Sequence, residues 1–341
     1  MSGPVVLGLD FGGSKIAVAV ADLTGKRLGS GRVQTEPALG ARWNLERGIS
    51  AARGLLGNIA AGRELVAVGA CTFGIPATYG IRLAPAIPGW GELALGLELT
   101  AAFGTRAVSV ATDVKAAAAA EARSGALVGH DPGLYVNLGT GLAVGIVSGG
   151  KVVAGANGAA GEIGYSLRQP SDLDLDRAHR LVLEEVVSGM AVSGVGTRRT
   201  GEELSAADVF AAENEDARLS GVLDDFVREL SFHLVNLAVA IDPSRIAVGG
   251  GMARSWERLE APLRRALEAN VPYPPELVLG AYPFDAALVG AIALGVEAAE
   301  EVTVDSNSEL TNGRTVASAV LGASRSINSE DTDRSEDRGR V

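Results

Sequence analysis

Cysteine is almost absent from this sequence of 341 residues, in which Cys71 is the only one. A single thiol excludes both an intrachain disulfide and a metal cluster held by several thiolates. Because Cys71 lies within the apolar segment 66–73, we expect a buried core thiol rather than a reactive one.

Positive charge is also scarce. The 30 Lys and Arg residues are outnumbered by 41 Asp and Glu, which gives a formal net charge of -11, and no basic stripe is visible. Nucleic-acid binding requires clustered Lys and Arg to neutralise phosphates, so we expect no nucleic-acid partner. Long apolar runs and a basic, signal-like N-terminus are missing too, which predicts a cytoplasmic protein with no membrane partner.

Glycine and apolar residues, in contrast, are abundant. The 45 glycines show no collagen-like period and 47% of the residues are hydrophobic, a composition typical of a globular α/β protein with tight turns. The length predicts two domains or one bilobal unit. Beyond residue 303 polar residues dominate, so we expect the tail 303–341 to be disordered.

A glycine turn between two apolar segments near the N-terminus predicts a β-hairpin that binds phosphate. Its two glycines lack the Cβ atoms that would keep a phosphate away from backbone N–H groups, and its serine adds a hydroxyl donor. An aspartate at the end of the first strand suits a hydrated magnesium ion. The residues expected to bind the nucleotide here are Asp10, Gly12, Gly13, Ser14 and Lys15.

The same pattern recurs further along the chain. Segment 136–147 predicts a second hairpin, so two glycine turns could bind one polyphosphate from opposite sides. A buried strand at 245–248 opens into another glycine turn, expected on the adenosine side of the nucleotide. The candidate ligand contacts in these two turns are Gly139, Thr140 and Gly141, and then Gly249, Gly250, Gly251 and Met252.

Asp113 lies at the junction between a predicted strand at 107–111 and an alanine-rich helix. Phosphoryl transfer depends mainly on positioning and charge neutralisation, and one carboxylate near the attacking hydroxyl suffices as a general base. The alternative is that Asp113 only caps the helix, because aspartate is a favoured N-cap.

Together with segments 155–164 and 184–189, these motifs resemble the ROK family (repressors, open reading frames and sugar kinases) of the actin, Hsp70 and sugar-kinase superfamily. The resemblance covers about residues 5–300. It implies an α/β, two-lobed, actin-like ATPase (ribonuclease H-like) fold of mixed sheets flanked by helices, with the active site in the interlobe cleft.

The resemblance also implies how the chain is divided and what it binds. Residues 1–112, completed by a helix at 286–302, would form the small lobe, and residues 113–285 the large lobe. ATP, with Mg²⁺ bound to Asp10 through water, would meet a small polyol between the lobes, with Asp113 as the general base. Glu162 and Glu184 fall at the positions of the family's sugar-contacting carboxylates, and family members are commonly homodimers.

The sequence departs from the family pattern at a structural zinc site. The usual histidine is replaced by Tyr165, and the usual cysteine positions fall near Leu175, Arg177 and Val182. None of these side chains is a ligand for tetrahedral zinc, so we expect no structural zinc. In the family this histidine also contacts the sugar.

Two further departures affect the expected acceptor pocket. Thr112 and Ala86 occupy positions where the family usually has asparagine. A site that hydrogen-bonds hydroxyls discriminates strongly through such groups, so plain glucose is not the expected acceptor. Within the wider range of acceptors that the resemblance implies, we expect a primary hydroxyl of a C7-cyclitol, of the kind made in aminoglycoside-like antibiotic biosynthesis, ahead of a modified or amino sugar.

The sequence leaves three alternatives to the expected polyol kinase. One is a glucokinase-like hexose kinase and another is a catalytically silent binding protein, although the retained Asp10, Asp113 and both hairpins count against silence. The third is a transcriptional regulator. Family repressors carry a helix-turn-helix domain ahead of the first phosphate motif, which begins here at residue 8, and we therefore expect none.

Overall fold

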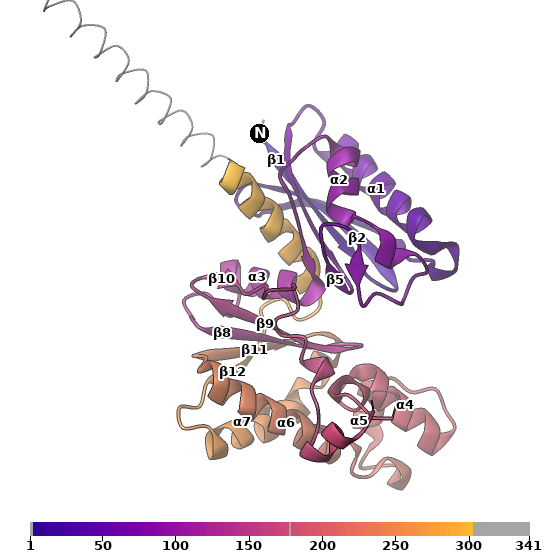
Figure 1. Ribbon diagram of the computed structural model, residues 1–341, viewed down its shortest axis with the longest axis vertical. Helices are drawn as coiled ribbons and strands as arrows, with labels where there is room; N and C mark the ends of the chain where they lie inside the picture. Colours follow the sequence, from indigo (N-terminus) through magenta and orange to yellow (C-terminus); the bar gives the residue numbers. More distant parts are fainter. Residues whose placement is uncertain (1–2, 177–178, 303–341) are drawn as a thin grey trace, which may run out of the picture.

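Two five-stranded mixed sheets form the framework of the molecule, one above the other in Figure 1. The computed structural model describes residues 3–176 and 179–302, so the predicted tail lies outside the described residues. The first sheet has the order β3-β2-β1-β4-β7. Its strands are β1 (Val5–Phe11), β2 (Lys15–Asp22), β3 (Arg27–Gln34), β4 (Leu65–Thr72) and β7 (Val108–Thr112).

The second sheet repeats this topology with the order β10-β9-β8-β11-β12. In each sheet the first three strands form an antiparallel meander, and two parallel strands follow beside its first strand. The strands are β8 (Gly133–Leu138), β9 (Leu142–Ser148), β10 (Lys151–Val152), β11 (Arg245–Gly249) and β12 (Glu276–Leu279). The weak internal duplication in the sequence is therefore a duplication of sheet topology. A small hairpin, β5 (Ile75–Pro76) with β6 (Ile81–Arg82), extends from the first sheet.

Amphipathic helices cover the outer face of each sheet (Figure 1). Helices α1 (Gly40–Ile59) and α2 (Leu95–Phe103) lie on the first sheet, where Leu45 and Trp90 are fully buried. The second sheet is covered by α6 (Val222–Ile241) and α7 (Trp256–Asn270), with α4 (Gly189–Thr200) and α5 (Ala206–Ala212) beside them. Short 3₁₀ turns are η1 (Pro37–Leu39), η2 (Trp90–Glu92), η3 (Ile163–Tyr165), η4 (Pro170–Asp174), η5 (Leu183–Glu185), η6 (Ala217–Leu219) and η7 (Gly251–Ser255).

Two helices lie between the sheets and bring them together. Helix α3 (Asp113–Ser124) packs on β8 and β9, and its residues 114–121 are all buried. The helix at 286–302, gold in Figure 1, packs Leu288, Ile292 and Val296 against the first sheet. Among the described helices, none has the length and hydropathy needed to cross a membrane.

Candidate active site

The first glycine turn joins β1 to β2 and is exposed between the two sheets. The Gly12 N–H donates to the Lys15 carbonyl at 3.0 Å, and the Thr35 hydroxyl donates to the Gly12 carbonyl at 2.8 Å, which fixes the turn. A Cβ on Gly12 would lie 2.9 Å from the Lys15 oxygen, whereas a Cβ on Gly13 would meet nothing within 4 Å. Gly12 is therefore required by the turn itself, and Gly13, with the exposed Ser14, leaves room for a ligand.

The second glycine turn joins β8 to β9 and is supported from α4. The Gly139 carbonyl accepts from the Gly189 N–H at 2.8 Å, and the Thr140 carbonyl accepts from the Met190 N–H at 3.3 Å. Behind the turn, Glu184 accepts a hydrogen bond from the Leu142 N–H at 2.8 Å, and a Cβ on Gly141 would lie 2.4 Å from the same carboxylate. Glu184 thus stabilises this turn, a role that its sequence position did not suggest.

The third glycine turn follows β11 and packs against the end of β8. Gly250 has a φ of 92°, and a Cβ there would lie 2.5 Å from the Leu138 carbonyl oxygen, so only glycine fits. Gly250 and Gly251 line a cavity, whereas Met252 is buried in the core of the second lobe. The Met252 side chain therefore supports the turn from inside.

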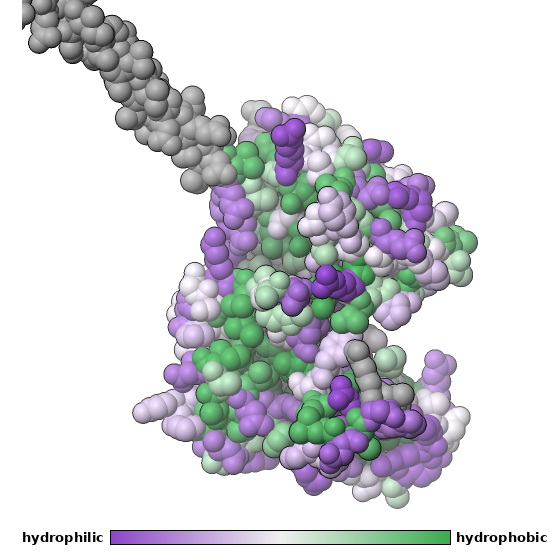
Figure 2. Space-filling model, viewed as in Figure 1, coloured by the Kyte–Doolittle hydropathy of each residue, from purple (hydrophilic) through white to green (hydrophobic). Residues whose placement is uncertain are grey.

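A cavity of about 280 Å³ lies between the first and third glycine turns, and residues 139–141 of the second turn are not among its lining residues. It brings together Lys15 from the first hairpin, Asp113 from the start of α3 and the third glycine turn. Figure 2 shows that the molecule narrows between its upper and lower parts. Sequence reasoning missed several of its lining residues, because they carry no recognisable motif: Tyr135, Asn137, Arg254, Pro283 and Phe284. Arg254 stacks over the Phe284 ring with 4.7 Å between its guanidinium carbon and the ring centroid.

Asp10 and Asp113 form an acidic pair at the phosphate end of the site. Burial raises the pKa of Asp10 to about 6 and Asp113 adds to the rise, while Cys71 and Lys15 oppose it. Raised pKa values mean that the two carboxylates are not easily ionised at the same time. A hydrated divalent cation beside the exposed first glycine turn would neutralise both, so the pair suits such a cation. The described residues contain no group of three or more metal-binding side chains, and magnesium commonly needs only one or two carboxylates with water and phosphate.

Cys71 is buried on β4 beside this acidic pair. Its thiol donates to Asp10 Oδ1 at 3.4 Å, and burial raises its pKa well above the ordinary value. The prediction of a core thiol is therefore confirmed.

Asp113 is the first residue of α3, and Thr112 is its N-cap. The Thr112 hydroxyl accepts from the Lys115 N–H at 3.2 Å, so capping does not require the Asp113 carboxylate. Burial, together with a smaller effect of the nearby Glu162, raises the pKa of Asp113 to about 6. At neutral pH Asp113 is still mostly ionised and can accept a proton.

Glu162 lies close to Asp113 in the loop after β10. Gly161 positions it, because the Gly161 carbonyl accepts from the Val144 N–H at 2.8 Å and the glycine has a φ of 83°. The Glu162 carboxylate lies 3.4 Å from the Lys115 ammonium. Lys115 is 6% exposed and was not anticipated from sequence; its one signal is a lone lysine within an alanine-rich helix.

The remaining residues predicted for the acceptor pocket differ in exposure. Thr112 is buried through its capping role, Tyr165 is 49% exposed at the end of η3, and Ala86 is exposed on the loop before η2. In the region of the missing zinc motif, His179 pairs with Asp176 at 2.7 Å, and Arg177 lies outside the described residues. The absence of zinc stays a prediction.

The duplicated sheets, with a cavity lined by Lys15, Asp113, Gly250 and Gly251, have the two-lobed architecture of the actin-like ATPase class. The sequence model described as "ROK family" matches residues 6–297, so the chain belongs to the ROK family.

Individual relatives agree with this assignment. The kanosamine kinase of Amycolatopsis mediterranei is 29% identical over 89% of this chain and 100% of its own length. A Halalkalibacterium halodurans glucokinase is 33% identical over 48% of this chain and 54% of the glucokinase. The crystal structure of a ROK family glucokinase from Streptomyces griseus, in complex with glucose and AMPPNP, is 27% identical, covers 86% of this chain and 99% of its own, and superposes with a TM-score of 0.70.

Proposed function

We propose that this protein is an ATP-dependent kinase that transfers the γ-phosphate of ATP to a hydroxyl of a small sugar-like polyol. The observation that carries the proposal is the cavity in which Lys15, Asp113 and the Gly250–Gly251 turn come together from both halves of the chain. In this assignment residues 1–112 with helix 286–302 form one lobe and residues 113–285 the other. The relatives named as kinases support the same reaction class.

Asp113 acts as the general base in this reaction. Its carboxylate accepts the proton as the acceptor hydroxyl attacks the γ-phosphorus and the bond to the β–γ bridging oxygen of ATP breaks. The backbone N–H groups at Gly12, Gly13 and Gly139–Gly141, with Ser14 and Lys15, orient the phosphates. Mg²⁺, held through water on Asp10, neutralises phosphate charge when it is bound.

For the acceptor we propose a C7-cyclitol or a modified or amino sugar, phosphorylated on a primary hydroxyl, in preference to plain glucose. Ala86 and the substantially exposed Tyr165 supply few of the hydrogen bonds that a pocket for an ordinary hexose would use. The relative named kanosamine kinase, which matches along its whole length, supports a modified acceptor. We also propose a cytoplasmic homodimer without structural zinc, which light scattering and metal analysis of the purified protein would test.

A panel of glucose, kanosamine, N-acetylmannosamine and a C7-cyclitol, each with ATP and Mg²⁺, tests the function by ADP release, with NMR locating the phosphate. Asp113→Asn should lower kcat by about 10²- to 10⁴-fold and leave the Kd for ATP within about twofold, because it removes only the base. A wild-type protein that releases no ADP with any acceptor, or an Asp113→Asn variant with undiminished kcat, would contradict the proposal.

A further inference from the structure

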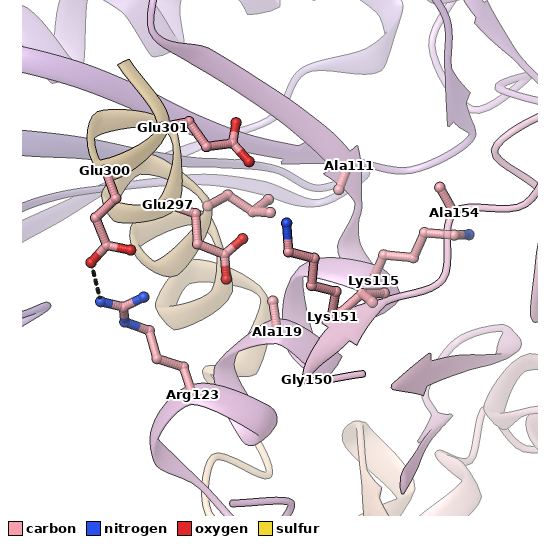
Figure 3. Close-up of a pocket in the computed structure, with 12 residues that line it drawn as sticks. Ala111, Lys115, Ala119, Arg123, Gly150, Lys151, Ala154, Glu297, Glu300 and Glu301 are labelled. Carbon is pink, nitrogen blue, oxygen red and sulfur yellow. Dashed lines mark hydrogen bonds and ion pairs between the residues drawn. The ribbon is translucent and has the colours of Figure 1, made fainter. Parts of the chain in front are cut away.

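A cavity of about 710 Å³ is lined by residues of α3, β10 and the helix at 286–302, several of them charged. Figure 3 shows three glutamates, Glu297, Glu300 and Glu301, along that helix, with Arg123 of α3 paired to Glu300 at 2.9 Å. The Lys151 side chain extends toward Glu297. Several carboxylates in this cavity are therefore within the same wall as its lysines and are candidates to pair with them.

Lys115 also lines this cavity, but its ammonium does not stay with those glutamates. In Figure 3 its side chain runs past Ala154, away from them. The ammonium ends 3.4 Å from Glu162 Oε1, so the aliphatic stem forms part of the cavity wall while the charge lies on the side of Asp113 and the candidate acceptor site. Burying a lysine side chain until it is only 8% exposed carries a large desolvation cost, which the ion pair with Glu162 offsets.

We propose that Lys115 is a positioning residue for the acceptor, anchoring the Glu162 carboxylate so that it can accept hydrogen bonds from the polyol's hydroxyls. This inference rests on the proposed kinase function. Three carboxylates lie close together here, Glu162, Glu184 and Asp113, and Lys115 acts on two of them. Without its cation, Glu162 would both repel Asp113 and lose its fixed orientation.

The charges around Glu162 give the proposal a pH signature. Burial raises the pKa of Glu162, Lys115 from α3 lowers it, and Glu184 from η5 raises it. Removing Lys115 therefore raises this pKa further, so Glu162 becomes protonated, and a poorer hydrogen-bond acceptor, at a higher pH than in the wild type.

The test compares Lys115→Met with Lys115→Arg, and with Lys151→Met as a matched control that removes an exposed lysine from the same cavity. Kinetics are measured with kanosamine, glucose and a C7-cyclitol from pH 5.5 to pH 8.5. At pH 8.5, Lys115→Met should raise the acceptor KM by about 10- to 100-fold, the value of one hydrogen bond to a charged group, with the ATP KM within about twofold. The acceptor KM should rise further as the pH falls, and Lys115→Arg should restore most of the affinity.

A second variant separates positioning from folding. Lys115→Met/Glu162→Gln removes the unpaired charge, so it should recover thermal stability but not acceptor affinity. An acceptor KM that is unchanged in Lys115→Met, that changes equally in Lys151→Met, or that returns to the wild-type value in the double variant would overturn the inference while the kinase function stands. A wild-type protein inactive with every acceptor would overturn both.

Discussion

Two adjacent residues, Thr112 and Asp113, have different roles at the start of α3. Thr112 is the N-cap of the helix, and the Asp113 carboxylate accepts a hydrogen bond, at 2.9 Å, from the Val114 N–H while it also lines the cavity. The structure thus places Thr112, and not Asp113, at the N-cap position, while the catalytic role of Asp113 stays a proposal. A buried carboxylate that is not needed to cap its helix is costly for folding, and such costs are common at functional sites.

Replacing Asp113 by asparagine should stabilise the fold at neutral pH. Its pKa is raised from 3.8 to about 6, so the ionised form is disfavoured in the folded state, and this cost is present above pH 6 and vanishes below about pH 4. Asp113→Asn should raise the free energy of unfolding by about 1 to 3 kcal/mol at pH 8 and by little at pH 4. Urea unfolding at both pH values measures this. An equal effect at both pH values would argue against a strained carboxylate.

The same pKa predicts the acid limb of the activity profile. Because a general base must be ionised, kcat should fall as the pH drops through about 6, with Asp113 as the titrating group. Asp10 titrates in the same range, so the profile reports the pair unless Mg²⁺ binding lowers both pKa values. Profiles of kcat at a limiting and at a saturating Mg²⁺ concentration check this, and a profile that is flat down to pH 4.5 at the limiting concentration would contradict it.

At the scale of elements, the loop that carries Glu162 depends on one close approach. Gly161 has a φ of 83°, and a Cβ there would lie 1.8 Å from the Val144 carbonyl oxygen on β9. Gly161→Ala should therefore destabilise the protein by about 2 to 4 kcal/mol and raise the acceptor KM, because Glu162 moves.

Gly149 provides the control for this substitution. It has a comparable φ of 62°, but a Cβ there would meet nothing within 4 Å. Gly149→Ala should cost only about 1 kcal/mol and leave the acceptor KM unchanged, since only the backbone strain remains. Thermal unfolding and acceptor kinetics of the two variants test this prediction. Equal losses of stability in both variants would contradict the role of the Gly161–Val144 contact.

The elements of this fold were predictable where the chain carries a clear period or turn. Apolar segments on either side of a glycine turn predicted the hairpins β1–β2 and β8–β9, and the glycine turns predicted where these hairpins close. In the described part of residues 155–188, that is 155–176 and 179–188, the regular elements are short 3₁₀ turns, which leave no period to detect. The contacts of Glu184 with β9 and of Lys115 with Glu162 join distant segments, so no local pattern could reveal them.

At the scale of the whole molecule, the site is formed because two similar sheets are brought together by helices that cross closely. Gly8 and Gly69 in the first sheet leave room for the helix at 286–302, since a Cβ on Gly69 would lie 1.9 Å from the Ala291 carbonyl oxygen. The same helix contacts α3, where a Cβ on Gly290 would lie 1.9 Å from the Ala116 carbonyl oxygen. The position of Asp113 relative to Asp10 is therefore set by small residues far from the chemistry.

Gly290→Ala should push α3 away from the helix at 286–302 and weaken the binding of ATP and of the acceptor together. The added methyl meets backbone on α3, which cannot move aside as a flexible side chain would. We therefore expect the free energy of unfolding to fall by at least about 2 to 3 kcal/mol, and kcat to fall as well.

Gly57→Ala in α1 is the control. A Cβ there meets nothing within 4 Å, so the alanine should stabilise the protein by about 0.5 to 1 kcal/mol through helix propensity alone. Chemical unfolding and steady-state kinetics measure both variants. If Gly290→Ala matched Gly57→Ala in stability and kcat, the crossing of these two helices would not control the geometry between Asp10 and Asp113.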